Sequence, residues 1–324
     1  MRYRAFGSTG WQISEIGFGA WQLGGDWGTT VDAESIRTLH YAFERGINFV
    51  DTAQMYGRGR SETVVGMALR QWRGSRIYVA TKVQPVAWPS PDEGDPQMRG
   101  RYPAWYLREQ VDACLGRLGV EQIDLLQLHC WIPRGVEELD WLETLNALRL
   151  AGKIGHIGVS IRDYRPEDGI PLAQLGLVQS MQVVFNLFEQ RPATGLFKAA
   201  DRNRPAFIAR VPLDSGSLTG TWTADTYAGW EPGSVPHTLF RDERFGQTLA
   251  RVAALRTLCS PHYPTLAEAA MRYVLSAPET TTVIPGMRTP AEIDMNIAYA
   301  DGAPFPAELR ERLPAHAWPR NYYR

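Results

Sequence analysis

The sequence has no excess of positive or negative charge, and it contains few cysteines and lysines. The 34 Lys and Arg residues balance 35 Asp and Glu residues, and both signs are mixed along the chain. This balance excludes the basic stripe that is typical of a nucleic-acid-binding protein. The only cysteines, Cys114, Cys130 and Cys259, are far apart, so the sequence indicates neither a disulfide framework nor a zinc site. We expect no bound metal.

Long apolar runs are missing as well. The N-terminus alternates polar and apolar residues from Met1 and has no apolar stretch of the kind found in a secretory signal. No run approaches the ~20 apolar residues that cross a membrane. We therefore expect a cytoplasmic protein without a membrane partner. Its 324 residues, 44% of them hydrophobic, contain no linker-like segment, which predicts a single domain over residues 1–324.

What the sequence does contain is a repeated alternation of strand-like and helix-like segments. The strand-like runs are residues 16–20, 47–50, 77–81, 123–128, 154–160, 181–185, 206–211 and 281–284. Such alternation requires parallel strands joined by crossover helices, and this number of strands favours an α/β protein with a closed (β/α)₈ TIM barrel over an open doubly wound sheet. Alternating residues at 3–13, around Gly7-Ser8-Thr9-Gly10, predict an N-terminal β-hairpin.

Two long segments interrupt the regular spacing of strands. They cover residues 83–103, after the third strand, and residues 212–239, after the seventh. Because both follow a strand, a barrel would place them as long loops on its C-terminal face, where active sites of this fold are built.

Four ionisable residues stand at the ends of three consecutive strands. Asp51 and Tyr56 follow the second strand, Lys82 ends the third, and His129 follows the fourth. Successive strand ends are neighbours in a barrel, so we expect these side chains to share one pocket. Lys82 stands out because the chain has only two other lysines, Lys153 and Lys198, and otherwise uses arginine.

The chemistry of these four side chains suits carbonyl reduction. An ammonium beside a phenol stabilises the phenolate, so we expect Lys82 to lower the pKa of Tyr56 and make it a proton donor. Asp51 would anchor Lys82 by an ion pair, and His129 would hydrogen-bond the carbonyl oxygen. No nucleophile is placed for acyl transfer, so hydride must come from a cofactor. Taken singly, each residue could instead be a cap, an ion-pair member or an ordinary core residue.

These positions resemble the catalytic signatures of the aldo-keto reductase family. The resemblance rests on Asp51-Thr52-Ala53 with Tyr56-Gly57, on Ala80-Thr81-Lys82-Val83, and on Asp124 to His129, and it extends over nearly the whole chain. It implies an NADP(H)-binding barrel without a dinucleotide-binding Rossmann unit. The sequence agrees, because Gln22 stands where that fingerprint requires its third glycine.

The resemblance also implies which residues bind the cofactor. Ser160 and Gln182 match the contacts to the nicotinamide carboxamide, Asp51 lies near its ribose, and Arg288 and Asn296 match contacts to the 2′-phosphate and adenine. The full expected set is Asp51, Ser160, Gln182, Arg210, Leu213, Gly216, Leu218, Gly286, Arg288, Glu292 and Asn296.

The chain departs from the family pattern at four of these positions or next to them. Ile161 replaces a common asparagine, Arg210 replaces a tyrosine that stacks on nicotinamide, and Thr221 replaces a lysine near the pyrophosphate. Glu292 stands where arginine or glutamine is common and would repel a 2′-phosphate. We expect NADP(H) as the cofactor, with NAD(H) as the alternative.

Aromatic residues at predicted loop positions indicate the substrate pocket. We expect it to be lined by Trp21, Tyr56, Trp88, His129 and Trp131 and to accept a small carbonyl compound or alcohol. Trp222 also lies in a predicted loop, and the tail after Pro314, with Trp318, Tyr322 and Tyr323, is expected to fold over the cavity.

Two other functions remain open at this point. Relatives of the resembled family keep the barrel as non-catalytic, nucleotide-sensing or partner-binding subunits, and Lys82 could form a Schiff base in a lyase or aldolase. The sequence predicts no oligomeric state.

Overall fold

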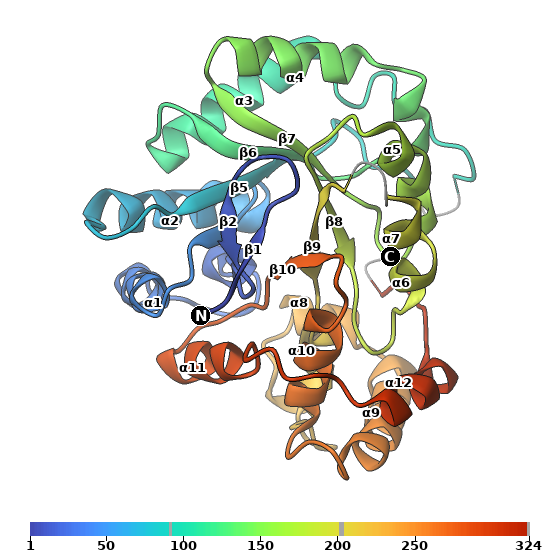
Figure 1. Cartoon of the computed structure of the whole chain (residues 1–324). Helices are drawn as coiled ribbons and strands as arrows, with labels where there is room; N and C mark the ends of the chain where they lie inside the picture. The colour runs from blue at the N-terminus through green and yellow to red at the C-terminus, as the bar shows by residue number, and fades with distance from the viewer. Residues whose placement is uncertain (91–92, 201–203, 323–324) are drawn as a thin grey trace.

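A closed barrel of parallel strands forms the centre of the computed structural model, which describes residues 1–90, 93–200 and 204–322 (Figure 1). The barrel strands are β3 (Phe18–Gly19), β4 (Phe49–Asp51), β5 (Tyr78–Val83), β6 (Ile123–Leu128), β7 (Ile154–Ser160), β8 (Ser180–Val184), β9 (Ala206–Arg210) and β10 (Thr280–Val283). Neighbours in sequence are neighbours in the sheet, and every ladder between them is parallel. Two isolated parallel bridges, Ile16 to Val283 and Gly19 to Gly286, join the first strand to the last.

The predicted (β/α)₈ barrel is therefore confirmed. Its helices are α1 (Asp32–Glu44), α2 (Arg60–Gln71), α3 (Ala104–Leu118), α4 (Asp140–Leu150), α5 (Ile170–Leu175), α6 (Arg191–Thr194), α7 (Leu196–Ala199), α8 (Val235–Leu239), α9 (Glu243–Cys259), α10 (Leu266–Leu275), α11 (Pro290–Ala298) and α12 (Ala307–Arg312). Except for α8, these helices pack apolar residues on the outside of the barrel and form the main hydrophobic core. Among the described residues, no helix is both long and apolar enough to cross a membrane.

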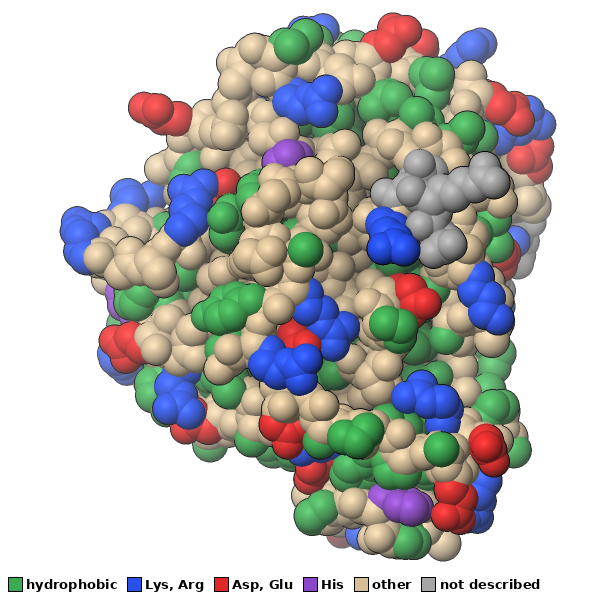
Figure 2. All heavy atoms as spheres, viewed as in Figure 1, with side chains coloured by type: hydrophobic (Ala, Val, Ile, Leu, Met, Phe, Trp, Pro, Cys, Tyr) green, Lys and Arg blue, Asp and Glu red, His purple; other side chains and the backbone are tan. Residues whose placement is uncertain are grey.

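An N-terminal hairpin closes one end of the barrel. Its strands β1 (Tyr3–Ala5) and β2 (Gln12–Ser14) pair antiparallel, as the alternation predicted. Phe6 and Ile13 of the hairpin pack with Phe49, Leu125 and Ile208, which point into the barrel, in a second and smaller core. The hairpin lies across this end in Figure 1, and on the same face acidic and basic side chains are interspersed (Figure 2). The functional cavity must therefore open at the other end.

The long segment after β9 forms a small folded unit of its own. It contains α8 and short 3₁₀ turns, and its aromatic side chains gather around Phe240 and Phe245. Trp222 and Trp230 pack edge to face with a centroid separation of 5.0 Å and both contact Phe240. This cluster fixes the position of the segment beside the C-terminal ends of the strands.

Gly66 allows close contact between two helices of the outer layer. A Cβ atom at Gly66 in α2 would lie 2.3 Å from the Leu118 carbonyl oxygen at the end of α3, whereas one at the exposed Gly116 in α3 would meet nothing within 4 Å. We predict that Gly66→Ala lowers the free energy of unfolding by about 1–3 kcal/mol, because the backbones must separate. Gly116→Ala should raise it by about 0.5–1 kcal/mol through helix propensity. Urea unfolding of both variants checks this, and equal effects would contradict the close contact.

Candidate active site

A buried ion pair lies at the mouth of the barrel. The Lys82 ammonium donates to Asp51 Oδ2 at 2.5 Å, to the Thr52 carbonyl oxygen at 2.8 Å and to the Tyr56 hydroxyl at 3.2 Å. Lys82 is fully buried, and Asp51 is 2% exposed. The register of the parallel strands explains the contact, because β4 ends at Asp51 while β5 continues past its partner Ala80 to Lys82. All three ammonium protons are thus used, and one of them points at the phenol.

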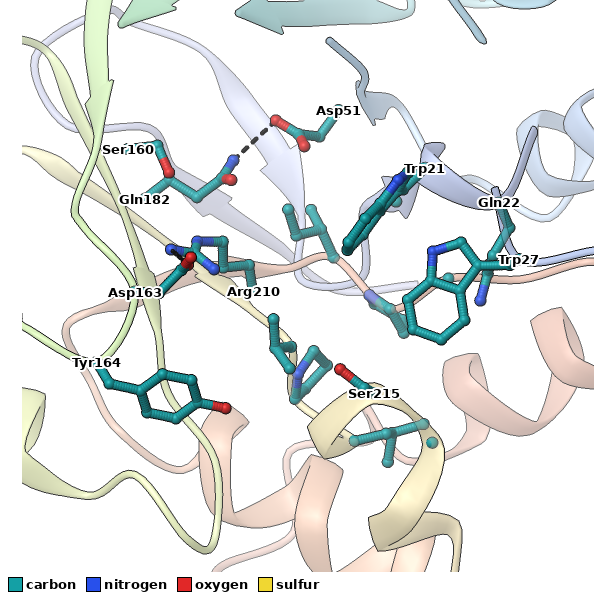
Figure 3. Close-up of a pocket in the computed structure, with 18 of the residues that line it drawn as sticks. Trp21, Gln22, Trp27, Asp51, Ser160, Asp163, Tyr164, Gln182, Arg210 and Ser215 are labelled. Atoms are coloured by element: carbon teal, nitrogen blue, oxygen red, sulfur yellow. Dashed lines mark hydrogen bonds and ion pairs between the residues drawn. The ribbon is translucent and has the colours of Figure 1, made fainter. Parts of the chain in front are cut away.

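Two glutamine side chains hold the other oxygen of the same carboxylate. Asp51 Oδ1 accepts from Gln182 Nε2 at 2.8 Å and from Gln127 Nε2 at 3.1 Å. Our sequence analysis missed Gln127, although a polar residue inside the apolar strand β6 is a signal for a buried polar contact. Gln182, expected to contact only the cofactor, also fixes Asp51. Figure 3 shows its side chain pointing from β8 towards Asp51.

Tyr56 is held from a second side by the loop after β3. The Trp21 ring stacks on the Tyr56 ring with centroids 5.5 Å apart and planes 19° apart. Asp26 Oδ2 accepts from Trp21 Nε1 at 3.1 Å and from the backbone N–H of Gly57 at 3.0 Å. Asp26 therefore orients both the ring above Tyr56 and the backbone after it, a role that our sequence analysis did not identify. His129 meets the Tyr56 ring edge-on, with centroids 5.8 Å apart.

Burial governs the proton affinities of this cluster. It raises the pKa of Tyr56, and the opposing charges of Lys82 and Arg210 do not cancel it. Lys82 does act to lower the pKa of Tyr56, as expected, but desolvation of the phenolate outweighs the ammonium, so the pKa stays above its ordinary value. Burial also works to lower the pKa of Lys82, but Asp51 and Tyr56 overcome it and raise that pKa above its ordinary value. Burial, with Lys82 and Arg210, places the pKa of His129 well below 6.5.

These directions define the charge states at neutral pH. Tyr56 is a neutral phenol that holds a proton, Lys82 is an ammonium, and His129 is a neutral imidazole. The cluster can donate a proton from Tyr56 and has a cation in place to stabilise the phenolate that remains.

A single cavity of about 1280 Å³ opens above this cluster. It exceeds the ~300–1,000 Å³ of a typical small-molecule pocket, so it has room for more than one ligand. Its wall includes the C-terminal ends of β7, β8 and β9, the loop after β3, the segment after β9 and the start of α11. The described residues contain no group of His, Cys, Asp and Glu side chains that could hold a metal ion.

Most of the residues expected to bind substrate or cofactor lie on this wall. They are Trp21, Asp51, Tyr56, Trp88, His129, Ser160, Gln182, Arg210, Leu213, Gly216, Gly286, Arg288, Glu292 and Asn296. Lys82 lies behind Tyr56 and Asp51. Figure 3 shows Ser160, Gln182 and Arg210 on one side of the hollow and Trp21, Gln22 and Trp27 on the other.

Two of the expected positions lie outside the wall. Trp131 is fully buried, packs edge-on against Trp141 and donates from Nε1 to the Asp168 carbonyl oxygen at 3.0 Å. The prediction that Trp131 lines the substrate pocket is therefore wrong, because its ring points into the layer between barrel and helices. Leu218 is likewise buried in the main core rather than on the wall, so its side chain does not reach a ligand there.

Arg210 is held by the loop that follows β7. Its Nη2 donates to the Ile161 carbonyl oxygen at 2.9 Å and to Asp163 Oδ1 at 2.7 Å. Ile161 is buried and contributes this carbonyl, where many sequences of the resembled family carry asparagine. The contact between Arg210 and Asp163 is drawn in Figure 3.

At the far end of the cavity, Glu292 caps helix α11. Its Oε2 accepts from the backbone N–H of Arg288 at 2.6 Å and of Thr289 at 3.0 Å, while the Thr289 side chain accepts from the Glu292 N–H. This reciprocal capping box fixes the carboxylate at the start of the helix. The Arg288 side chain reaches across to the Trp27 carbonyl oxygen at 2.8 Å. Thr221 is exposed and lies off the wall.

Among the buried polar atoms of this wall that have no hydrogen-bond partner among the described residues, two are side-chain amide oxygens. They are Gln22 Oε1 and Asn296 Oδ1, both buried. Buried polar atoms are normally paired, so these oxygens suit the amino and hydroxyl groups of a nucleotide. With Ser160 and Gln182 at the catalytic end, the residues present fit an extended dinucleotide.

The C-terminal tail borders the same cavity. Pro319, Arg320 and Asn321 lie on the wall, as the sequence predicted for the tail as a whole. Arg320 Nη2 donates to the buried Asp214 at 2.5 Å, and its guanidinium lies 4.0 Å from the Trp318 ring centroid. Trp318 and Tyr322 pack against protein rather than facing the cavity, and Tyr323 lies outside the described residues.

The fold and the site together define a (β/α)₈-barrel protein with a proton-donating phenol at the mouth of the barrel. Comparison with known proteins gives the family, because the aldo/keto reductase family matches residues 15–317. The chain belongs to this family and is an oxidoreductase of carbonyl compounds that uses a nicotinamide cofactor.

Individual relatives cover nearly the whole chain. It is 30% identical over 298 residues to the aldo-keto reductase YhdN of Bacillus subtilis (strain 168), which covers 91% of this chain and 87% of the relative. It is 27% identical over 315 residues to the NADH-specific methylglyoxal reductase of Escherichia coli (strain K12), covering 92% and 93%. The solved structure of the glycerol dehydrogenase AKR11B4 from Gluconobacter oxydans matches with a TM-score of 0.77 at 26% identity, covering 97% and 94%.

The depressed pKa of His129 makes stability depend on pH. The unfolded histidine binds a proton below about pH 6.5, but the buried one does not, so stability is lost as pH falls through that value. In the wild type, His129 alone should lower the free energy of unfolding by up to about 1.4 kcal/mol for each pH unit below 6.5. We predict that His129→Asn abolishes this contribution. Urea unfolding at pH 7, 6 and 5 measures how the free energy of unfolding of each variant depends on pH. The same substitution at the exposed His262 should leave the slope unchanged, and equal slopes for both variants would refute the burial argument.

Proposed function

We propose that this protein reduces an aldehyde or ketone to an alcohol, or catalyses the reverse, with hydride from NAD(P)H and a proton from Tyr56. The observation that carries the proposal is the Lys82 ammonium placed between the Tyr56 hydroxyl, at 3.2 Å, and Asp51, at 2.5 Å, beneath a large cavity. A reduced nicotinamide supplies the hydride, and one proton is added to the carbonyl oxygen to complete the alcohol.

Each residue of the cluster has a defined part in that proton transfer. Tyr56 holds the proton at neutral pH and lies on the cavity wall, where a carbonyl compound would bind. Lys82 remains charged and stabilises the phenolate as it forms, while Asp51 holds the ammonium in place. His129, neutral and also on the wall, contributes a ring nitrogen that can hydrogen-bond the same oxygen.

The wall near Tyr56 supports a neutral substrate. Trp21 and Trp88 flank Tyr56 and His129, with the Trp88 ring centroid 5.8 Å from that of His129. Such aromatic faces bind apolar parts of a small carbonyl compound.

The start of α11 supports NAD(H) rather than the NADP(H) that our sequence analysis favoured. A helix N-terminus attracts an anion such as a 2′-phosphate, but here the Glu292 carboxylate already lies at the start of the helix and accepts from the N–H groups of Arg288 and Thr289 just before it. A phosphate at this place would meet a negative charge, whereas a ribose hydroxyl could donate to it. The relative in Escherichia coli described as NADH-specific agrees with this choice.

The Schiff-base alternative has less support. A lysine attacks a carbonyl only as a neutral amine, and here Asp51 and Tyr56 raise the pKa of Lys82. Lys82 is also fully buried behind Tyr56. A non-catalytic sensor would bind the cofactor without turnover, which the following experiment distinguishes.

Removing the phenolic hydroxyl tests the proposed proton donor. We predict that Tyr56→Phe lowers kcat/KM for NADH-dependent reduction of a panel of aldehydes by about 10²–10⁴-fold. Its affinity for NADH should stay near that of the wild type, because the ring and its stacking on Trp21 remain. Tyr263→Phe, outside the cavity, serves as the control. Undiminished turnover in the Tyr56 variant would refute the assignment, and cofactor binding without turnover in the wild type would favour the sensor.

Removing the charge of Glu292 tests the cofactor preference. We predict that Glu292→Gln lowers KM for NADPH by about tenfold and changes KM for NADH by less than about twofold, because the amide oxygen still caps the helix without the charge. Glu268→Gln, at the equivalent position of α10 and outside the cavity, is the matched control. A wild-type preference for NADPH, unchanged by the substitution, would contradict the argument.

A further inference from the structure

Tyr102 holds the main chain that carries His129. Its hydroxyl donates to the Cys130 carbonyl oxygen and accepts from the Cys130 backbone N–H, both at 3.0 Å. Tyr102 and Cys130 are both buried. The N–H belongs to the peptide that joins His129 to Cys130, so a single side chain fixes the main chain directly after the histidine.

The main chain around His129 lies at the point where it leaves the barrel sheet. Strand β6 ends just before His129, whose N–H still donates to the Val83 carbonyl oxygen at 2.8 Å. The next backbone hydrogen bond along the chain is made by the Trp131 N–H, which donates to the Ser160 carbonyl oxygen at 2.7 Å. Tyr102 holds the peptide groups between these two points, where the regular ladder of the sheet no longer does so.

The direction of the His129 ring depends on this stretch of main chain. Its Nδ1 atom is buried and has no hydrogen-bond partner among the described residues. In many sites a hydrogen bond to one ring nitrogen orients the imidazole. Here the ring packs edge-on against the rings of Tyr56 and Trp88, with both centroids 5.8 Å away. A shift of the main chain would therefore carry the ring with it.

Tyr102 itself is firmly placed. Pro103 restricts the backbone of the residue before it, and helix α3 begins directly afterwards at Ala104. Burial raises the pKa of Tyr102 well above its ordinary value, so the hydroxyl keeps the proton that it donates to Cys130. Tyr102 does not lie on the cavity wall, so it can act on a ligand only through the residues that it holds.

We propose that Tyr102 is a positioning residue for carbonyl reduction, because its two hydrogen bonds to Cys130 aim the His129 ring at the carbonyl oxygen. This inference rests on the proposed function, which gives His129 the part of hydrogen-bonding that oxygen. Such a hydrogen bond strengthens as negative charge develops on the oxygen in the transition state. A misplaced ring should therefore lower the rate of reaction more than the affinity for the substrate.

Tyr102→Phe tests the inference because it removes the hydroxyl and keeps the ring. We predict that it lowers kcat for NADH-dependent reduction of an aldehyde about tenfold. KM for the aldehyde and the dissociation constant of NADH should stay within about twofold of the wild type. In a His129→Asn background, the same substitution should change kcat by less than about twofold, because the ring that Tyr102 positions is gone.

Two variants control for effects on the fold. Tyr3→Phe removes a comparable hydroxyl, which donates to the Gly46 carbonyl oxygen at 3.0 Å in the hairpin region, and should leave kcat unchanged. Gly66→Ala, away from the cavity wall, should lose stability and keep its kcat. Melting temperatures of all variants verify that the proteins compared are folded.

The outcomes separate this inference from the proposed function. A loss of kcat that disappears in the His129→Asn background supports the positioning role, and an equal loss in both backgrounds overturns it. A crystal structure of Tyr102→Phe tests the geometry without an assay: we expect the His129 ring to be displaced from the Tyr56 ring, and a ring in the wild-type place would overturn the inference. If the wild type reduces no aldehyde, the proposed function fails, while the crystal structure still tests whether Tyr102 positions His129.

Discussion

The site depends on one buried ion pair, that of Lys82 and Asp51. Both groups are almost completely removed from water, and the protein interior strongly disfavours isolated charges. The pair persists because its hydrogen-bonding capacity is filled by Tyr56, Thr52, Gln127 and Gln182. These contacts come from three parts of the barrel mouth: the segment after β4, strand β6 and strand β8. The closed sheet therefore brings together the partners that stabilise the buried Lys82–Asp51 pair. The Lys82 ammonium in turn can stabilise the phenolate of Tyr56.

The sequence predicted the barrel, the hairpin and the four central residues because these depend on local pattern and strand order. Asp51, Lys82 and His129 follow or end strands that parallel pairing must bring together. The features that the sequence did not predict depend on the direction in which a side chain points and on the balance between desolvation and charge interactions. Trp131 and Trp21 both follow a strand, but only the three-dimensional path of the loop decides that one ring turns into the core and the other towards Tyr56.

The pKa of Tyr56 likewise could not be predicted from the sequence. A neighbouring ammonium could be inferred from spacing, but the extent of desolvation could not, and desolvation decides the direction of the shift. Asp26 was missed for a related reason. Its importance comes from two hydrogen bonds, to Trp21 and Gly57, which join residues separated along the chain by a folded loop.

The hairpin that seals the barrel has a consequence for the order of events. Phe6 and Ile13 pack in the core at the opposite end, so no ligand passes through the barrel, and whatever binds in the cavity enters and leaves on the side of the C-terminal strand ends. With nicotinamide bound near Asp51, Ser160 and Gln182 as proposed, and a substrate against Trp21 and Trp88, both ligands would share that side of the barrel. The hairpin thus makes the release of one ligand depend on where the other one sits.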